Sequence, residues 1–180
     1  MRRVAVVGVS GAGKTRLARM LAAALEVPHV ELDSIYHQPG WQGLDDDEFR
    51  RRVSERLSGD GWVADGNYST VRPIVLARAD TAVWLDLPRW LVARRVISRT
   101  LRRTITREEL WNGNREPLSG PFRLDPEKNI ILWSITKHGR YREQYGSRMA
   151  DPELSHIHWI RLTSDREVDE LLRSVGGSGL

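Results

Sequence analysis

The sequence predicts an α/β fold with a doubly wound, five-stranded parallel sheet in the strand order 2-3-1-4-5. Three observations lead to this prediction. Segments with the pattern of buried strands alternate with amphipathic helices along the chain. The first such strand, Val4–Val7, is a continuous apolar run, which is typical of a central strand buried on both faces of a parallel sheet. A glycine-rich loop and a helix follow it directly, as a right-handed crossover requires.

Composition limits the function classes. The chain has 180 residues, of which 40% are hydrophobic and 29% charged, and this fits a single domain over residues 1–180. It has no cysteine, so disulfides, a thiol nucleophile and cysteine-ligated metal sites are excluded. No apolar run approaches the roughly 18 residues of a membrane span, and no export signal is recognisable. We therefore expect a cytoplasmic protein without a membrane partner.

The next elements follow from periodicity and from turn residues. The first helix is predicted over Lys14–Leu25, where leucines recur at every fourth position before Pro28. His29–Leu32 is the second predicted strand and places Asp33 at its carboxyl end. Ser34–Leu44, which contains a Pro-Gly pair, is predicted to be a loop.

The middle of the chain continues the alternation. Asp45 and Glu48 have the spacing of a capping box and predict the start of the next helix. Trp62–Ala64 and Thr81–Leu85 are the third and fourth predicted strands, and a helix is expected to open at Pro88.

The last elements are separated from the others by a polar insertion. Residues 100–128 are rich in arginine, proline and glycine, and we predict a lid over the site there, with a plain surface excursion as the alternative. His156–Leu162 is the fifth predicted strand and Ser164–Val175 the last helix. The glycine-rich residues 176–180 are expected to be frayed.

Residues 8–15 carry a phosphate-binding motif. The string GVSGAGKT matches G-x-x-x-x-G-K-[ST] at every fixed position, between the first strand and the first helix. Such a loop turns its N–H groups towards phosphate oxygens, while the lysine reaches the β and γ phosphates and the hydroxyl binds Mg²⁺. We therefore expect ATP as the ligand and the fold of P-loop nucleoside triphosphate hydrolases. The residues expected to bind the nucleotide are Gly8, Ser10, Gly11, Ala12, Gly13, Lys14 and Thr15.

Magnesium also needs a carboxylate at a strand end beside this loop. Asp65 and Asp86 are the candidates that would join Thr15, because each follows a strand predicted to flank the first. Asp65 is preferred, since Gly66 leaves room for a ligand. Asp86 is explained equally well as the N-cap of the helix that follows it.

Arginines cluster in the helix that leads into the predicted lid. Arg95, Arg99 and either Arg102 or Arg103 recur on one helical face, although the formal net charge of the chain is only +4. Like charges at this spacing repel, so we expect a polyanion among them. A solvated basic face is the alternative.

A second substrate is expected beside the nucleotide. No N-K-x-D guanine-binding string occurs, so transfer to an acceptor is favoured over a GTPase switch. Asp33, at a predicted strand end, is the expected base or positioning group for a hydroxyl. Tyr36, His37 and Trp41 follow it, but packing against the core is the preferred explanation for these three.

Several further strings resemble one family of P-loop proteins. They are similar to the adenylate-kinase-related proteins often labelled DNA topology modulation proteins, and the similarity covers nearly the whole chain. The strings are Leu32-Asp33, Pro39-Gly40-Trp41, Trp62-Val63-Ala64-Asp65-Gly66-Asn67-Tyr68, Trp84-Leu85-Asp86-Leu87-Pro88 and Glu109-Leu110-Trp111-Asn112-Gly113-Asn114.

This resemblance implies roles for individual residues. In adenylate kinases the first arginine after the fourth strand lies against the ATP base and the second binds phosphates, which implies these roles for Arg95 and Arg99. The Phe-Pro-Arg that follows Asp-Gly in those kinases is replaced here by Asn67–Ser69, so the arginine that grips a nucleoside monophosphate is missing, unless Arg72 substitutes. Asp33 resembles the residue with which shikimate and gluconate kinases hold a hydroxyl. Both a nucleotide and a small alcohol therefore stay open as acceptors.

Two functions compete at this point. The first is a phosphotransferase that moves the γ-phosphoryl of Mg-ATP to an acceptor, with Lys14, Asp33, Arg95 and Arg99 as the catalytic residues. The second is a nucleic-acid-associated ATPase that affects DNA topology, with the arginine face on a phosphate backbone. The small net charge and the lack of a recognisable nucleic-acid module give nucleic acid less support as a partner. The sequence does not indicate the oligomeric state.

Overall fold

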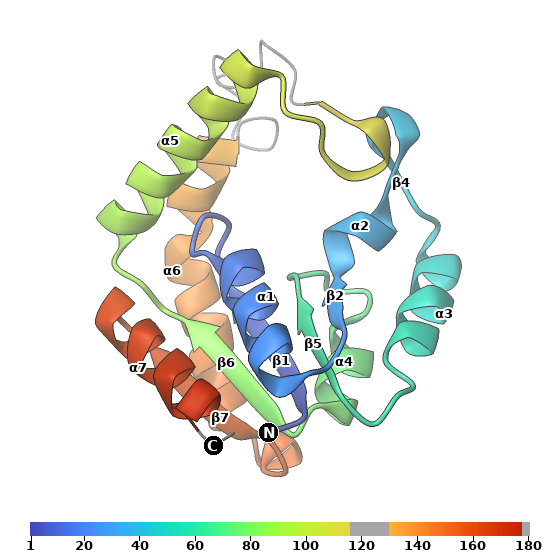
Figure 1. Cartoon of the computed structure of the whole chain (residues 1–180), viewed down its shortest axis with the longest axis vertical. Helices are drawn as coiled ribbons and strands as arrows, with labels where there is room; N and C mark the ends of the chain where they lie inside the picture. Colours follow the sequence, from blue (N-terminus) through green and yellow to red (C-terminus); the bar gives the residue numbers. More distant parts are fainter. Residues whose placement is uncertain (116–129, 178–180) are drawn as a thin grey trace.

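A parallel five-stranded sheet forms the centre of the molecule. The computed structural model describes residues 1–115 and 130–177, with the course of the chain only for residues 130–135. The sheet has the order β2-β5-β1-β6-β7, which confirms the predicted fold and strand order (Figure 1). Its strands are β1 (Arg3–Gly8), β2 (His29–Glu31), β5 (Trp62–Asp65), β6 (Thr81–Leu85) and β7 (His158–Leu162).

Helices cover the sheet, and α5 and α2 lie above it in the view of Figure 1. None of the described helices is long and apolar enough to cross a membrane. The helices are α1 (Lys14–Leu25), α2 (Leu32–Tyr36), α3 (Asp46–Arg56), α4 (Arg72–Arg78), α5 (Arg89–Thr106), α6 (Ile130–Met149) and α7 (Asp165–Gly176).

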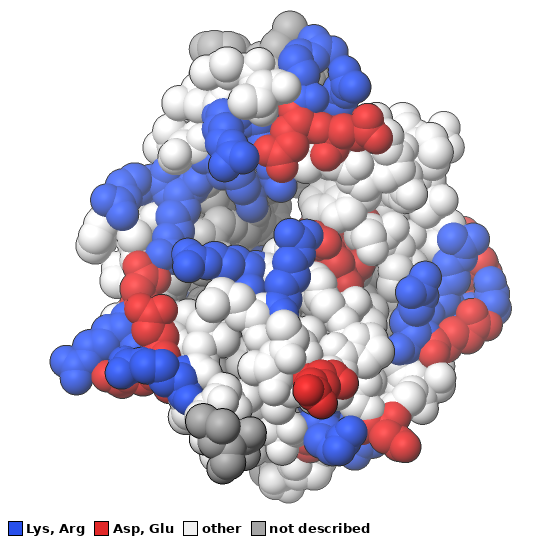
Figure 2. All heavy atoms as spheres, in the orientation of Figure 1, with Lys and Arg blue, Asp and Glu red and all other residues white. Residues whose placement is uncertain are grey.

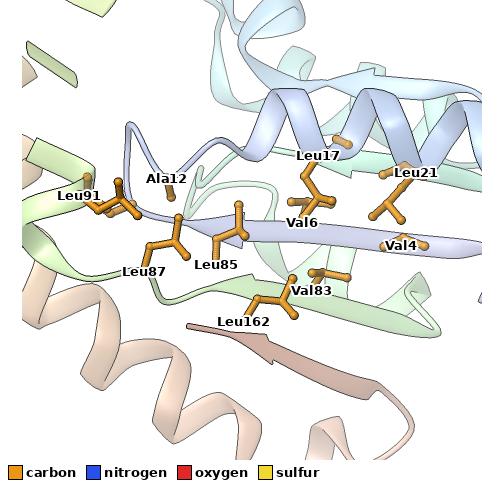
Figure 3. Close-up of a cluster of buried hydrophobic side chains, with 14 of the residues drawn as sticks. Val4, Val6, Ala12, Leu17, Leu21, Val83, Leu85, Leu87, Leu91 and Leu162 are labelled. Atoms are coloured by element: carbon orange, nitrogen blue, oxygen red, sulfur yellow. The ribbon is translucent and has the colours of Figure 1, made fainter. Parts of the chain in front are cut away.

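Alternate side chains of β1 enter two different parts of the core. Val4 and Val6 point to the face covered by α1, where they pack with Leu17 and Leu21 (Figure 3). Ala5 belongs to the cluster on the other face, which includes residues of α3 and α4. All of these valine and alanine side chains have no exposed surface, as the continuous apolar run predicts. The central strand therefore holds the phosphate loop at the end of a rigid element.

Side-chain caps fix the ends of two helices where the sequence predicts them. Asp45 Oδ1 accepts from the N–H groups of Asp47 and Glu48 at 2.9 and 3.3 Å, at the start of α3. Ser164 Oγ accepts from Glu167 N at 3.3 Å at the start of α7. Each cap satisfies N–H groups that have no partner within the helix.

The structure differs from the prediction mainly around the expected loops. The second strand ends at Glu31, and α2 begins at once, so Asp33 lies in a helical turn. The loop predicted over 34–44 contains a short antiparallel pair, β3 (His37–Gln38) and β4 (Gln42–Gly43). Helix α4 was not predicted, because it is short and its sequence shows little periodicity.

The predicted insertion is helical in its first part. Helix α5 runs to Thr106, and residues 107–115 form a turn that includes a short 3₁₀ segment. Residues 116–129 of the predicted lid lie outside the described residues. At the other end, α7 includes residue 176 of the predicted tail, while residues 178–180 are not described.

Candidate active site

The phosphate loop, residues 8–15, connects β1 to α1. Gly11 and Gly13 have φ values of 85° and 98°, in the left-handed region that favours glycine. A Cβ atom at Gly11 would also clash with the side chain of Val96 in α5. Gly13 is the N-cap of α1, and no described side chain caps this end, so the first N–H groups of the helix are available to an anion.

Lys14 begins α1 and directs its ammonium group into the loop. Its Nζ donates to the carbonyl oxygen of Val9 at 3.2 Å. Desolvation lowers the pKa of Lys14 from its ordinary value, while the charges of Asp33 and Asp65 act in the opposite direction. The charges of both predicted carboxylates therefore act on Lys14. A phosphate group bound here would further favour its charged form.

Thr15, the last residue of the loop, is hydrogen-bonded to Asp65 at the end of the neighbouring strand. Thr15 Oγ1 donates to Asp65 Oδ2 at 2.7 Å, and Asp65 Oδ1 lies 2.6 Å from His29 Nε2. The Asp65 residue is 3% exposed, and it ends the strand next to β1. A hydroxyl and a carboxylate are donors that Mg²⁺ accepts, with water completing its coordination. These two residues therefore fit the ion.

Asp86, the other predicted magnesium ligand, is engaged by two arginines. Its Oδ1 accepts from Arg142 Nε at 2.8 Å and its Oδ2 from Arg161 Nε at 3.0 Å. The N-cap of α5 is Pro88, so the alternative that Asp86 caps this helix is wrong. The ion pairs join the end of β6 to α6 and β7.

Helix α5 brings the two predicted arginines to the phosphate loop. Arg99 Nη2 donates to Ser10 Oγ and Arg95 Nη1 donates to the carbonyl oxygen of Ala12, both at 3.3 Å. Arg95 Nη2 also donates to both carboxylate oxygens of Asp165, at 2.6 and 2.7 Å. Asp165 begins α7, so this ion pair holds Arg95 between the loop and that helix.

Two cavities adjoin this contact. One of 480 Å³ lies between the phosphate loop, α1, α5 and α7, and Arg95 and Leu172 are among its lining residues. The other, of 830 Å³, follows the arginine-rich face of α5. Figure 2 shows basic side chains gathered around a hollow in this face of the molecule. The basic residues that line the 830 Å³ cavity are Arg16, Arg94, Arg95, Arg99, Arg102 and Arg103.

Asp33 lies at the centre of a hydrogen-bonded group on the other side of the loop. Tyr68 donates from its hydroxyl to Asp33 Oδ1 at 2.6 Å, and the same hydroxyl lies 3.3 Å from His37 Nε2. Desolvation and the charge of Asp33 strongly raise the pKa of Tyr68, so the phenol stays protonated and donates. Tyr68 thus fixes the orientation of the Asp33 carboxylate.

Aromatic rings enclose this group. Tyr36 lies 4.6 Å from Tyr68 and 5.1 Å from Phe49, between ring centroids, so packing explains Tyr36 as expected. Packing on the core does not explain Trp41, whose residue is 37% exposed. Its ring lies 5.2 Å from that of His37.

The segment 107–115 closes onto the loop that carries these rings. Asn114 Oδ1 accepts from Trp41 N and Asn114 Nδ2 donates to the carbonyl oxygen of Gln38, both at 2.9 Å. Trp111 stacks on His37 with 5.5 Å between centroids. The described part of the predicted lid after α5 is therefore bound to the loop that follows Asp33.

Sequence reasoning missed four residues of this arrangement: His29, Tyr68, Trp111 and Asn114. A usable signal existed for the last three, because they belong to the Trp- and Asn-containing strings that carry the family resemblance. For His29 the signal is the parallel pairing of β2 with β5: His29 lies opposite Val63, two residues before Asp65, so His29 and Asp65 are on the same face of the sheet.

Comparisons with known proteins show the fold. No family model and no curated protein matches the chain. A gluconokinase from Sinorhizobium meliloti superposes with a TM-score of 0.51 and 19% identity, over 98% of this chain and 90% of that one. A shikimate kinase from Bacteroides thetaiotaomicron gives 0.56 and 14%, over 98% and 97%. A sugar kinase from Janibacter sp. gives 0.50 and 18%, over 97% and 93%. The chain thus has the fold of P-loop kinases.

Proposed function

We propose that this protein is a phosphotransferase that moves the γ-phosphoryl group of Mg-ATP to a hydroxyl group of a small acceptor. One observation carries the proposal. The charges of Asp33 and Asp65 both act on the buried ammonium group of Lys14, and Asp65 also accepts the hydrogen bond of Thr15 Oγ1. The carboxylate expected to position the acceptor and the carboxylate expected to bind the metal therefore share one electrostatic environment with the lysine of the phosphate loop.

The nucleotide would be held by the loop and by α5. The loop amides and Lys14 bind the β and γ phosphates, while Arg99, in contact with Ser10, supplies positive charge beside them. Arg95 and the 480 Å³ cavity that it lines offer a place for the base. Thr15 and Asp65 would hold the magnesium ion, which neutralises charge on the phosphate oxygens when bound.

Asp33 would position the acceptor. Its carboxylate accepts the hydrogen bond of the acceptor hydroxyl and takes up the proton as the new O–P bond forms. The bond between the γ phosphorus and its bridging oxygen breaks, and ADP leaves with that electron pair. Because Tyr68 already donates to Asp33 Oδ1, the carboxylate is oriented before the acceptor binds.

The aromatic rings around Asp33 offer apolar surface, which favours an acceptor with a ring or another apolar face. The fold neighbours include a gluconokinase and a shikimate kinase, whose names are those of enzymes for hydroxyl acceptors, and this supports an alcohol over a nucleotide. Three further points belong to the proposal: a lid over residues 100–128, membership of the adenylate-kinase-related topology modulation proteins, and a cytoplasmic location.

The arginine-lined cavity of 830 Å³ favours the second candidate, a nucleic-acid-associated ATPase. A polynucleotide that neutralises these arginines would bind with a steep salt dependence. Stimulation of ATP turnover by polynucleotide, with that salt dependence, would favour this candidate. The contact of Arg99 with the phosphate loop gives more support to the kinase.

An acceptor screen tests the proposal. ADP release from Mg-ATP is measured with matched pairs of compounds: nucleosides and nucleoside monophosphates, and sugars and sugar acids, with Lys14→Ala as the control. We expect one class to stimulate ADP release in the unaltered chain and to yield a phosphorylated product by mass spectrometry. ADP release that no acceptor changes would contradict the proposal.

A further inference from the structure

Two guanidinium groups meet where the last turns of α6 approach the start of α4. With its amide oxygen facing them, the side chain of Gln144 accepts from Arg72 Nη1 and from Arg148 Nη1, each at 3.2 Å. Arg72 Nη2 also donates to the carbonyl oxygen of Asn67 at 3.1 Å. Both guanidinium groups therefore point towards the same side chain, that of Gln144.

The positive charge of this pair is not balanced within the described part of the chain. Neither arginine forms an ion pair with a carboxylate there, and Asp151 acts on Arg148 only at longer range. Desolvation and the charge of Arg72 both lower the pKa of Arg148. In addition, Arg72 Nε is buried without a hydrogen-bond partner among the described residues. Such a donor costs free energy unless a ligand satisfies it.

An aromatic wall and an asparagine connect the pair to the phosphate loop. Tyr145 has no exposed surface, and the guanidinium carbon of Arg148 lies 6.0 Å from its ring centroid. The hydroxyl of Tyr145 donates to Asn67 Oδ1 at 3.0 Å, and Asn67 Nδ2 donates to the carbonyl oxygen of Gly8. The two arginines are therefore held in place beside the loop, although no described hydrogen bond joins either of them to a loop residue.

We propose that Arg72 and Arg148 form a binding site for an oxyanion, a phosphate or carboxylate group, separate from the phosphate loop. Planar guanidinium groups bind both kinds of oxyanion through paired N–H donors. The Nε–H of Arg72, which has no partner among the described residues, supplies a hydrogen-bond donor to the site. The two guanidinium groups together give the site a positive charge, which favours an anion. The neutral amide of Gln144, which contacts both groups, is a weaker partner for them than an anion.

Binding of inorganic phosphate, measured by calorimetry in the Lys14→Ala background, tests this site independently of nucleotide binding. We expect Arg72→Gln and Arg148→Gln each to weaken phosphate binding about tenfold or more. Arg173→Gln, an exposed arginine of α7, is the matched control and should bind like the background. Equal phosphate affinity in all four proteins, or no phosphate binding to the Lys14→Ala protein, would overturn the proposal.

Two further measurements complete the test. Calorimetry with acetate in place of phosphate distinguishes a carboxylate ligand from a phosphate ligand. Similar affinities for the two anions support both ligand classes. Binding of phosphate alone supports a phosphate ligand only. Arg148→Lys keeps the charge but loses the forked donors, so we expect intermediate affinity with an unchanged circular dichroism spectrum. If Arg148→Lys binds phosphate as the background does while Arg72→Gln is also unchanged, the site is refuted. Failure of ATP binding in the unaltered chain would refute the proposed kinase and leave this result unaffected.

Discussion

The hydroxyl of Tyr68 donates a 2.6 Å hydrogen bond to Oδ1 of Asp33. In the comparison with the Phe-Pro-Arg string of adenylate kinases, Tyr68 stands at the proline and Ser69 at the arginine. Tyr68 thus replaces the proline of that string and orients a carboxylate of the protein. An acceptor that presents a hydroxyl to Asp33 is consistent with this exchange.

Removal of the phenol hydroxyl should impair transfer without affecting the nucleotide. We expect Tyr68→Phe to lower kcat about tenfold, since the Asp33 carboxylate loses a hydrogen bond that orients it. Asp33→Asn should abolish transfer, while Kd for ATP stays within about twofold of the unaltered chain. Steady-state rates and ATP titrations of both variants measure this. If Tyr68→Phe transfers at the full rate, the hydrogen bond has no role in positioning.

Arg99 should act on the reaction more than on binding. We expect Arg99→Ala to reduce kcat by about a hundredfold and the affinity for ATP by much less, because its charge next to Ser10 lies where the γ phosphate gains charge. Arg89→Ala, an exposed residue at the start of α5, is the control. If Arg99→Ala lowers only the affinity for ATP, Arg99 binds ATP in the ground state and does not stabilise the transition state.

Asn114 should hold the segment 107–115 against residues 38–41 of the loop that follows Asp33. It is 4% exposed, and its side chain binds both Trp41 N and the carbonyl oxygen of Gln38. Asn114→Ala removes these partners, and we expect about 1 to 3 kcal/mol less free energy of unfolding together with a change in tryptophan emission. Asn112→Asp tests the neighbouring contact with His37 and serves as a comparison. Unchanged emission and stability in Asn114→Ala would mean that the segment does not depend on this side chain.

The stability of the chain should depend on pH through His37. Desolvation lowers the pKa of His37 below its usual value of 6.5, and Asp33 opposes this only partly. Below pH 6.5 the unfolded chain therefore binds a proton that the folded chain does not yet bind. The contribution of His37 to the free energy of unfolding is therefore fully present above pH 6.5, and it decreases as the pH falls towards the pKa of His37 in the folded chain.

Urea unfolding at pH 7.5 and 5.5 measures this effect. His37→Phe keeps a ring against Trp111 but has no titrating group, so we expect its loss of stability over this range to be smaller than that of the unaltered chain. His158→Phe, on an exposed position of β7, is the control for general histidine titration. An equal loss in the unaltered chain and in His37→Phe would contradict the assignment.

The fold could be predicted because its signals are local. Val4–Val7 is apolar throughout, the glycine-rich loop has one structural solution, and Asp45 and Ser164 are strong caps. The error at Asp33 was also local. The short pattern of His29–Leu32 does not show whether Leu32 continues a strand or begins a helix, and only its packing in the core decides this.

Within the candidate site, the part that could not be predicted was the set of side-chain contacts between residues far apart in the chain. Lys14 and Thr15 belong to one motif, whereas the contacts of Asp33 with Tyr68 and of Trp41 with Asn114 join residues far apart in the chain. Periodicity carries no information about such pairs. The ion pairs of Asp86 show the same limit: a carboxylate at a strand end suits a metal ion, but Arg142 and Arg161 come from later elements.

Titration of the chain with ATP in the presence of Mg²⁺, monitored by calorimetry and thermal unfolding, tests the central claim most directly. We expect saturable binding at one site, a rise in the unfolding temperature, and the loss of both in Lys14→Ala, whose circular dichroism spectrum should be unchanged. Binding that is equally tight in Lys14→Ala, or no binding to the unaltered chain, would contradict the assignment of residues 8–15 as the phosphate-binding loop.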